Sequence, residues 1–180
     1  TFTLRTSEGF VETFGPALIA RAHRDAHRVK LSFVQKSDRD SAPLREGTVD
    51  LETGVLGKRS GPELRARALF RDRVVGVVRA GHPLGDGEVS ATRFAEARHV
   101  GVSRQGAEIE HVDAAMASIG LARDVVAIVD GFAKAIAIAR GSDLVACVPE
   151  RHTAGLRSGL HAFVLPVPVP EITVSLLWHP

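Results

Sequence analysis

The feature that most constrains the fold is a regular alternation of strand-like and helix-like segments. Residues 2–6 alternate apolar and polar side chains, whereas residues 10–22 carry their apolar side chains at helical spacing. Residues 29–34 then return to a strand-like pattern. Because parallel strands need a crossover connection, usually a helix, this order favours an α/β fold with mostly parallel sheets.

The alternation restarts after a break, which predicts two lobes. Residues 81–87 (GHPLGDG) form the break, since glycine and proline interrupt regular structure. The three prolines of residues 166–170 rule out a central strand and predict an extended crossover. We therefore expect a first lobe of residues 1–80 plus 168–180 and a second lobe of residues 88–165.

The remaining expected elements are as follows. Strands are predicted at residues 49–55, 64–70, 74–78, 99–102, 125–129, 144–148, 163–165 and 172–178. Helices are predicted at residues 40–46, 107–119, 132–140 and 150–157.

Composition excludes several classes of protein. The 180 residues carry a net charge of +2 and are 44% hydrophobic, which is ordinary for a globular domain. The apolar runs are much shorter than the ~20 residues of a membrane span, and we expect no membrane partner. A basic leader with an apolar core is not visible at the start. The cations are scattered, which argues against a nucleic-acid surface on this segment, and the single cysteine excludes an internal disulfide or a cysteine-based zinc site.

Catalytic and metal-binding motifs are weak. Residues 101–106 (GVSRQG) place Ser103 at a strand-to-helix junction, but a nucleophile elbow needs a glycine one residue earlier. His23 and His27 have helical spacing, yet no third ligand accompanies them. Cys147 lies in an apolar strand, as a structural thiol does. We predict no catalytic residue, no metal and no cofactor.

Polar side chains follow several of the predicted strands. The junctions include Ser7 and Glu8, then Lys36 and Ser37, and in the second half Ser103-Arg104 and Asp130-Gly131. In a parallel sheet these junctions share the carboxyl edge, where ligands bind beside helix N-termini. The pattern favours a small anion, most simply a carboxylate. Ordinary helix capping is the alternative explanation of each junction.

Three further segments resemble one known family. Residues 44–51 (LREGTVDL) resemble the L-x-x-G-x-[VL]-D-[LV] signature of LysR-type transcriptional regulators. Residues 77–84 (VVRAGHPL) resemble the strand and HPL of that family's lobe crossover, and residues 139–149 (ARGSDLVACVP) resemble its aaGxGixxvP segment. The order and spacing of all three fit, over essentially the whole chain.

The resemblance implies the effector-binding domain of such a regulator. The implied fold is α/β, with two Rossmann-like lobes of the periplasmic-binding-protein type (type 2) joined by two crossover strands. The effector binds between the lobes and shifts the population of lobe arrangements. The candidate effector contacts are Ser7, Glu8, Phe10, Lys36, Ser37, Ser103, Arg104, Gly131 and Phe132. Among them, Lys36 and Arg104 are the candidate counter-charges for an anionic effector.

The resemblance also implies partners. Family members are cytoplasmic, form homodimers or homotetramers, and bind DNA through an N-terminal winged helix-turn-helix, which is absent from this chain. The start at Thr1 in the middle of a strand pattern, and the stop at Pro180 before the family's closing helix, suggest a fragment.

Two acidic residues depart from the family pattern. Glu52 stands where the family more often has a small or apolar residue, and Glu8 places a negative charge in a turn expected to meet the effector. The alternative functions are a solute-binding protein of a transport system and an enzyme, namely a hydrolase using Ser103 or a two-lobed synthase.

Overall fold

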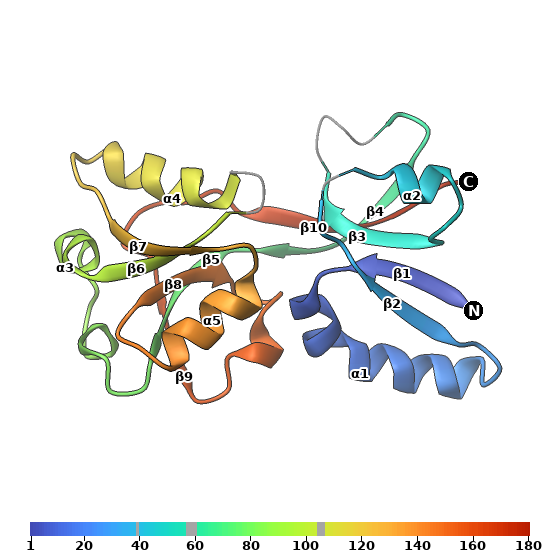
Figure 1. Ribbon diagram of the computed structural model, residues 1–180, viewed down its shortest axis with the longest axis horizontal. Helices are drawn as coiled ribbons and strands as arrows, with labels where there is room; N and C mark the ends of the chain where they lie inside the picture. The colour runs from blue at the N-terminus through green and yellow to red at the C-terminus, as the bar shows by residue number, and fades with distance from the viewer. Residues whose placement is uncertain (39, 57–60, 104–106) are drawn as a thin grey trace. The chain divides into compact units, whose positions relative to one another are not determined.

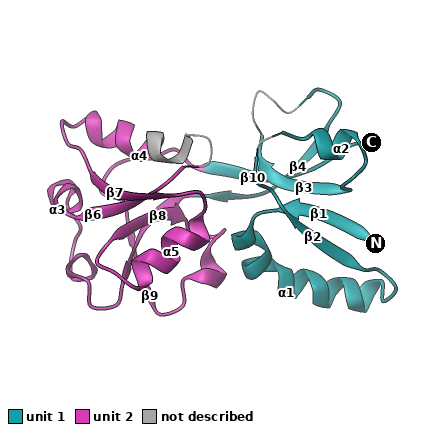
Figure 2. Cartoon of the chain, in the orientation of Figure 1, with its two compact units in different colours: residues 1–72, 172–180 teal, residues 73–171 magenta. Residues whose placement is uncertain are grey.

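The chain folds into two α/β units, each built on a five-stranded sheet. The computed structural model describes residues 1–38, 40–56, 61–103 and 107–180. Unit 1 comprises residues 1–72 and 172–180, and unit 2 comprises residues 73–171 (Figure 2).

Unit 1 has the sheet order β2-β1-β3-β10-β4. Strand β1 pairs in parallel with β2 and β3, while β10 is antiparallel to β3 and β4. Its elements are β1 (Phe2–Thr6), α1 (Glu8–Asp25), β2 (Leu31–Gln35), α2 (Ala42–Arg45), β3 (Leu51–Val55), β4 (Arg65–Asp72) and β10 (Ile172–Trp178) (Figure 1).

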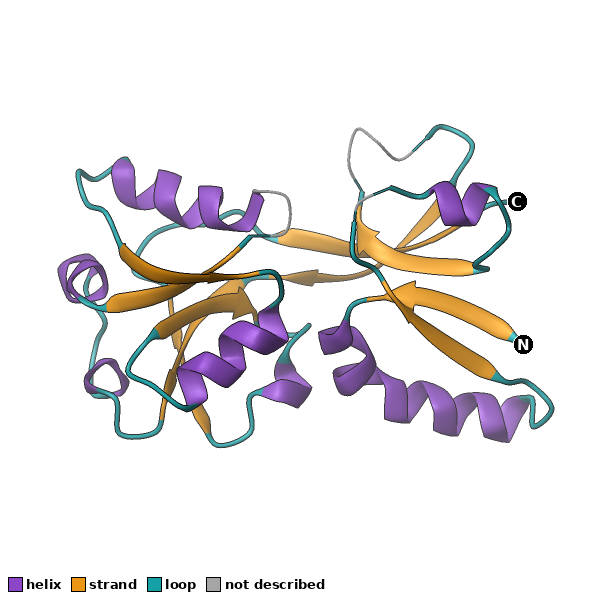
Figure 3. Ribbon diagram, in the orientation of Figure 1, coloured by secondary structure: helices purple, strands orange, loops and turns teal. Residues whose placement is uncertain are grey.

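Unit 2 has the sheet order β7-β6-β8-β5-β9. Strand β6 is parallel to β7 and β8, and β5 is antiparallel to β8 and β9. Its strands and helices are β5 (Val74–Arg79), η1 (Pro83–Gly85), α3 (Ala91–Glu96), β6 (Arg98–Val102), α4 (Ala107–Ala117), β7 (Asp124–Val129), α5 (Phe132–Arg140), β8 (Val145–Pro149), η2 (Ala154–Leu156) and β9 (Leu160–Val164) (Figure 3).

Two apolar clusters hold unit 2 together. Ile136 and Ala139 of α5 pack with Val100 and Val148 of the sheet. A second cluster joins Phe94 of α3 and Val112 and Met116 of α4 to Val78 and Val145. Because Val77 and Val78 are neighbours on one strand and belong to different clusters, helices cover both faces of this sheet, which explains the uninterrupted apolar run of β5.

The structure confirms the α/β class and corrects three local predictions. The sheets are mixed rather than mostly parallel, since β5 and β10 run against their neighbours. The predicted helix at residues 150–157 is a turn followed by the short η2. The helix α3 was not anticipated.

The boundary between the units also differs from the predicted one. The chain leaves unit 1 after Asp72, eight residues earlier than predicted, because β5 bonds to β8 and β9 of unit 2. The glycine-rich segment 81–87 is instead a turn within unit 2, where Gly81 and Gly87 both have φ of 75°. The return of residues 172–178 to the first unit agrees with the prediction.

Among the described residues, no helix is both long enough and apolar enough to span a membrane.

Candidate functional site

The carboxyl ends of β1 and β2 lie together in unit 1. The backbone N–H of Lys36, which follows β2, donates to the carbonyl of Thr6 at the end of β1, at 2.8 Å. Ser7 then caps α1, its Oγ accepting from the N–H of Phe10 at 3.3 Å. The structure thus brings the two predicted junctions, Ser7-Glu8 and Lys36-Ser37, side by side.

A buried carboxylate lies beneath these junctions. The Glu52 side chain on β3 is 0% exposed and accepts three hydrogen bonds. Arg5 Nη1 donates at 2.8 Å, Lys36 Nζ at 2.8 Å and Ser41 Oγ at 3.1 Å. These donors satisfy an otherwise costly buried charge. The Lys36 ammonium, predicted as a counter-charge for an effector, is therefore already paired with Glu52.

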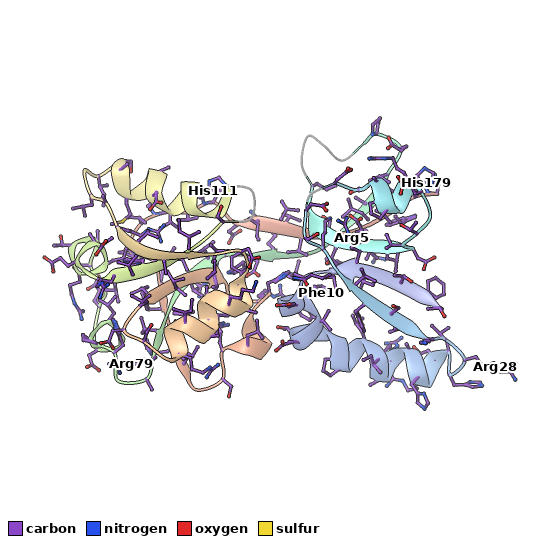
Figure 4. All side chains as sticks on the ribbon, viewed as in Figure 1. Arg5, Phe10, Arg28, Arg79, His111 and His179 are labelled. Atoms are coloured by element: carbon purple, nitrogen blue, oxygen red, sulfur yellow. The ribbon has the colours of Figure 1, made fainter. Side chains whose placement is uncertain are left out.

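Arg5 connects this carboxylate to the chain that follows β2. Its Nη2 donates to Asp38 Oδ1 at 2.7 Å, and its Nη1 also donates to the carbonyl of Asp40 at 2.6 Å. Arg5 is labelled in Figure 4. Burial opposes the charge of Arg5, but its hydrogen bonds to Asp38 and Glu52 outweigh burial and raise its pKa. The same hydrogen bond lowers the pKa of Asp38. Both side chains thus stay ionised near neutral pH.

Glu52 and Arg5 were not among the predicted site residues. Each carried a signal, since Glu52 departs from the family pattern and Arg5 is a charge inside a half-buried strand. Only the register of β1 and β3, which places Arg5 opposite Glu52, shows that the two signals belong together.

A small open pocket of about 240 Å³ lies between α1 and β2 of unit 1. Of the predicted residues, Ser7 and Glu8 line it, together with apolar Val11 and Phe33. Phe10 does not line it, because its ring is 5% exposed and packs on Phe14 with centroids 4.9 Å apart. Phe10 therefore supports the core of unit 1 more than it offers surface to a ligand.

In unit 2, the predicted residues also gather at adjacent strand ends. Ser103 follows β6, and its N–H donates to the carbonyl of Val129 at the end of β7, at 2.8 Å. Gly131 is the N-cap of α5 and supplies no side-chain oxygen to the first amides of that helix. Phe132 packs against the apolar cluster under α5. Arg104 lies outside the described residues.

The helix N-terminus of α5 can attract an anion. Its amide dipoles leave positive charge at that end, and Ser103 adds a hydroxyl donor nearby. Asp130 precedes the helix, but its carboxylate is paired with Lys134 Nζ at 2.6 Å, which reduces its repulsion of a second anion.

The structure gives no support to the metal and thiol alternatives within the described residues. His27 lies beyond the end of α1, so His23 and His27 do not share a helix face. No group of three potential ligands gathers in the described ranges. Burial raises the pKa of the Cys147 thiol to about 11, which favours the protonated thiol over the nucleophilic thiolate at neutral pH.

Sequence comparison identifies the family of this chain of two α/β units. The model of the LysR substrate binding domain matches residues 1–180, so the chain belongs to this family. It is 32% identical over 186 residues to the HTH-type transcriptional activator NahR of Pseudomonas putida, a match that covers 99% of this chain. The chain spans 60% of the length of that activator.

Solved structures share the fold. The regulatory domain of MexT, a transcriptional activator in Pseudomonas aeruginosa, superimposes with a TM-score of 0.83 at 21% identity, covering 99% of this chain and 89% of that one. The effector-binding domain of QuiR, solved in complex with shikimate, has a TM-score of 0.76 at 15% identity, covering 99% and 86%. The expected type 2 periplasmic-binding-protein fold is thereby confirmed.

Family membership favours one of the functions weighed from the sequence. The chain is a LysR substrate-binding domain, and the curated relatives named for it are transcriptional regulators. The individual site residues, and the expectation that both units contact the same effector, stay predictions.

Proposed function

We propose that this domain senses a small molecule bearing a carboxylate. The observation that carries the proposal is the N-terminus of α5, whose N-cap Gly131 brings no side-chain oxygen and which lies beside Ser103. A carboxylate there gains hydrogen bonds from backbone amides and a hydroxyl without burying a cationic side chain. The shikimate bound by the QuiR domain, itself a carboxylate, is consistent with this chemistry.

The unit 1 contacts have a different character. Ser7 and Ser37 offer hydroxyl groups, Glu8 is acidic, and Lys36 is paired with Glu52. We therefore assign the carboxylate of the effector to Ser103 and the N-terminus of α5 in unit 2.

A thermal-shift screen against small carboxylates, aromatic acids and amino acids tests this function. A carboxylate at 100 times its Kd adds about 2.7 kcal/mol to stability, which raises Tm by about 5–10 °C for a chain of this size. Ser103→Leu should abolish the shift while leaving the ligand-free Tm nearly unchanged. Ser118→Leu, an exposed serine just past α4, is the matched control. An undiminished shift in the Ser103 variant contradicts the assignment.

We further propose that the whole protein is a cytoplasmic, DNA-binding regulator without catalytic activity. The relatives are HTH-type regulators, and a domain of that type supplies the DNA contact. Effector binding then acts by shifting the population of the domain's conformations, to the extent that the effector prefers one of them.

The regulator is also proposed to be a homodimer or a homotetramer. Although Phe2, Val55 and Leu56 of unit 1 are exposed elsewhere, one edge strand of each sheet has exposed apolar side chains on it or near it. Near β2 in unit 1 they are Leu18, Ile19 and Val34, and near β7 in unit 2 they are Ile119, Val126 and Ile128. Apolar patches on edge strands are typical of association surfaces.

A further inference from the structure

A short segment of unit 1 carries a large excess of positive charge. Residues 21–30 (RAHRDAHRVK), which we call the basic segment, hold four arginines and lysines, two histidines and a single carboxylate. With neutral histidines the formal charge of this segment is +3, whereas the whole chain is only +2, so the rest of the chain has a net charge of −1. The cations are therefore scattered along most of the chain but concentrated here.

The basic segment lies at the carboxyl end of α1 and in the turn that follows it. The turn closes where the N–H of Val29 donates to the carbonyl of Ala26 at 2.8 Å, and Figure 4 labels Arg28 within it. All six basic side chains are exposed. Only residues 26–30 separate α1 from β2, so the cations of the helix end and of the turn are neighbours on the surface.

One carboxylate offsets part of this charge. Asp25 pairs with Arg21, and its Oδ1 accepts a hydrogen bond from Arg24 Nε at 3.3 Å. The two arginine side chains are nevertheless 71% and 66% exposed, and ion pairs at such exposed positions are weak. Arg28 and Lys30 form no ion pair within the described part of the chain. The segment thus keeps a positive charge that nothing in unit 1 neutralises.

Stabilisation of α1 accounts for only part of the positive charge. His23 and Arg24 lie in the last turn of the helix, where cations favour the negative end of the helix dipole. That effect fades within one turn, and Arg28 and Lys30 lie beyond the helix end. A polyanion outside the domain is the partner that would contact all of these cations together.

We propose that the basic segment binds the phosphate backbone of duplex DNA. The choice of partner rests on the proposed function, because a DNA-binding regulator holds its effector-binding domain close to duplex DNA. Arginine and lysine bind phosphate oxygens whatever the base sequence, so the segment adds affinity without adding specificity. It lies about 27 Å along α1 from Ser7 and is therefore separate from the effector contacts predicted in unit 1.

A membrane surface is the less favoured partner. Helices that lie on membranes combine a basic face with large apolar side chains such as Trp, Phe and Leu. Among residues 21–30, no exposed side chain is large and apolar. The charge of the segment is thus suited to phosphates in water more than to insertion among lipids.

The test measures binding of the 180-residue chain to a fluorescent DNA duplex of arbitrary sequence, between about 50 and 200 mM salt. Wild type should bind, and if its four arginines and lysines each neutralise one phosphate, the slope of log K against log[salt] should be about −3.6. Arg28→Gln/Lys30→Gln should weaken binding at least tenfold and bring that slope closer to zero by about 1.8. Absence of binding by wild type overturns the proposal.

Arg65→Gln/Arg67→Gln is the matched control. Both arginines are exposed on β4 of unit 1, and neither forms an ion pair among the described residues. This variant loses the same charge as Arg28→Gln/Lys30→Gln and should bind the duplex within twofold of wild type. Equal losses in the two double variants attribute the effect to net charge and overturn the proposal.

A gain of affinity separates a DNA-binding surface from a folding defect. Asp25→Asn removes the only carboxylate of the basic segment and should tighten binding about threefold at 0.1 M salt. Glu12→Gln removes a carboxylate from the same helix about 20 Å away, which is twice the Debye length of ~10 Å, and should leave the affinity unchanged. Unchanged binding by Asp25→Asn, or equal tightening by both variants, overturns the proposal.

Failure of the proposed function is recognised separately. The thermal-shift screen uses no DNA, so a chain that responds to a carboxylate but does not bind the duplex remains a sensor and loses the role of the basic segment. A chain that binds the duplex through residues 21–30 but responds to no acid keeps only that role. Binding to vesicles of phosphatidylserine and phosphatidylcholine without binding to the duplex overturns the proposal in favour of a membrane.

Discussion

The buried titratable side chains of this domain differ in whether a side chain of opposite charge contacts them. Glu52 and Arg5 are both buried and form an ion pair, in which Arg5 Nη1 donates to Glu52 Oε1 at 2.8 Å. His99 on β6 shows the opposite solution, since it is fully buried and neutral. Its Nε2 donates to the carbonyl of Phe94 at 2.8 Å, and its Nδ1 has no partner among the described residues. Burial lowers its pKa to about 4.

This histidine predicts a pH dependence of stability. Because the folded-state pKa lies below the unfolded value of 6.5, stability is complete above that value and falls as the pH decreases toward about 4. Between pH 7.5 and pH 5 the loss should be about 2 kcal/mol, measured by urea unfolding. His99→Gln should remove that part of the pH dependence, while His111→Gln, at an exposed histidine, should retain it.

At the scale of elements, local sequence signals begin and end the helices that carry the site. Ser7 starts α1 with a side-chain cap, and Glu8 in the first turn favours the positive end of the helix dipole. Gly131 starts α5 without such a cap. The two helices thus differ at their N-termini. In α1 the Ser7 side chain accepts a hydrogen bond from a backbone amide of the first turn, whereas the N-cap residue of α5 accepts none with its side chain and leaves the first amides to other acceptors, such as a ligand.

The cap of α1 can be tested by its removal. Ser7→Ala should lower the free energy of unfolding by about 1 kcal/mol and Tm by about 2–4 °C. Ser118→Ala, whose Oγ donates to the carbonyl of Ala115 and caps no N-terminus, should change stability by less than ~0.5 kcal/mol. Equal effects of both substitutions in thermal unfolding would argue against a capping role of Ser7.

At the scale of the whole molecule, the sheets of the two units have the same arrangement of parallel and antiparallel strands but different side chains on their edge strands. Each sheet has a parallel half followed by antiparallel strands, and each has an edge strand with exposed apolar side chains. The edges at β4 and β9 carry fewer of them, with Leu69 on the one and Val164 on the other. The exposed apolar side chains on and near β2 and β7 are the basis for proposing self-association through those edges.

Matched substitutions on the two edges of one sheet test this association. Ile128 on β7 and Val164 on β9 are both 65% exposed. Ile128→Glu should reduce the molar mass measured by light scattering or raise the dimer dissociation constant at least tenfold. Val164→Glu adds the same charge at the same exposure and should leave association unchanged. A larger effect of the Val164 substitution would place the interface at the other edge.

The site was only partly predictable from the sequence. The junctions at Ser7, Lys36 and Ser103 were identified because residues that follow parallel strands must meet at one sheet edge. The pairing of the Lys36 ammonium with Glu52 was not predictable, because Glu52 lies 16 residues further along the chain on a strand that local patterns do not connect to Lys36.

The sequence by itself determined the order of most helices and strands, because periodicity, caps and turn residues act over a few neighbouring positions. Its motifs also indicated the family and, with it, the class of fold. Tertiary structure alone decided the strand order, the assignment of β5 to unit 2 and the meeting of Arg5 with Glu52 across 47 residues. Such pairings depend on which strands become neighbours, and that choice is made by the packing of whole faces rather than by any local segment.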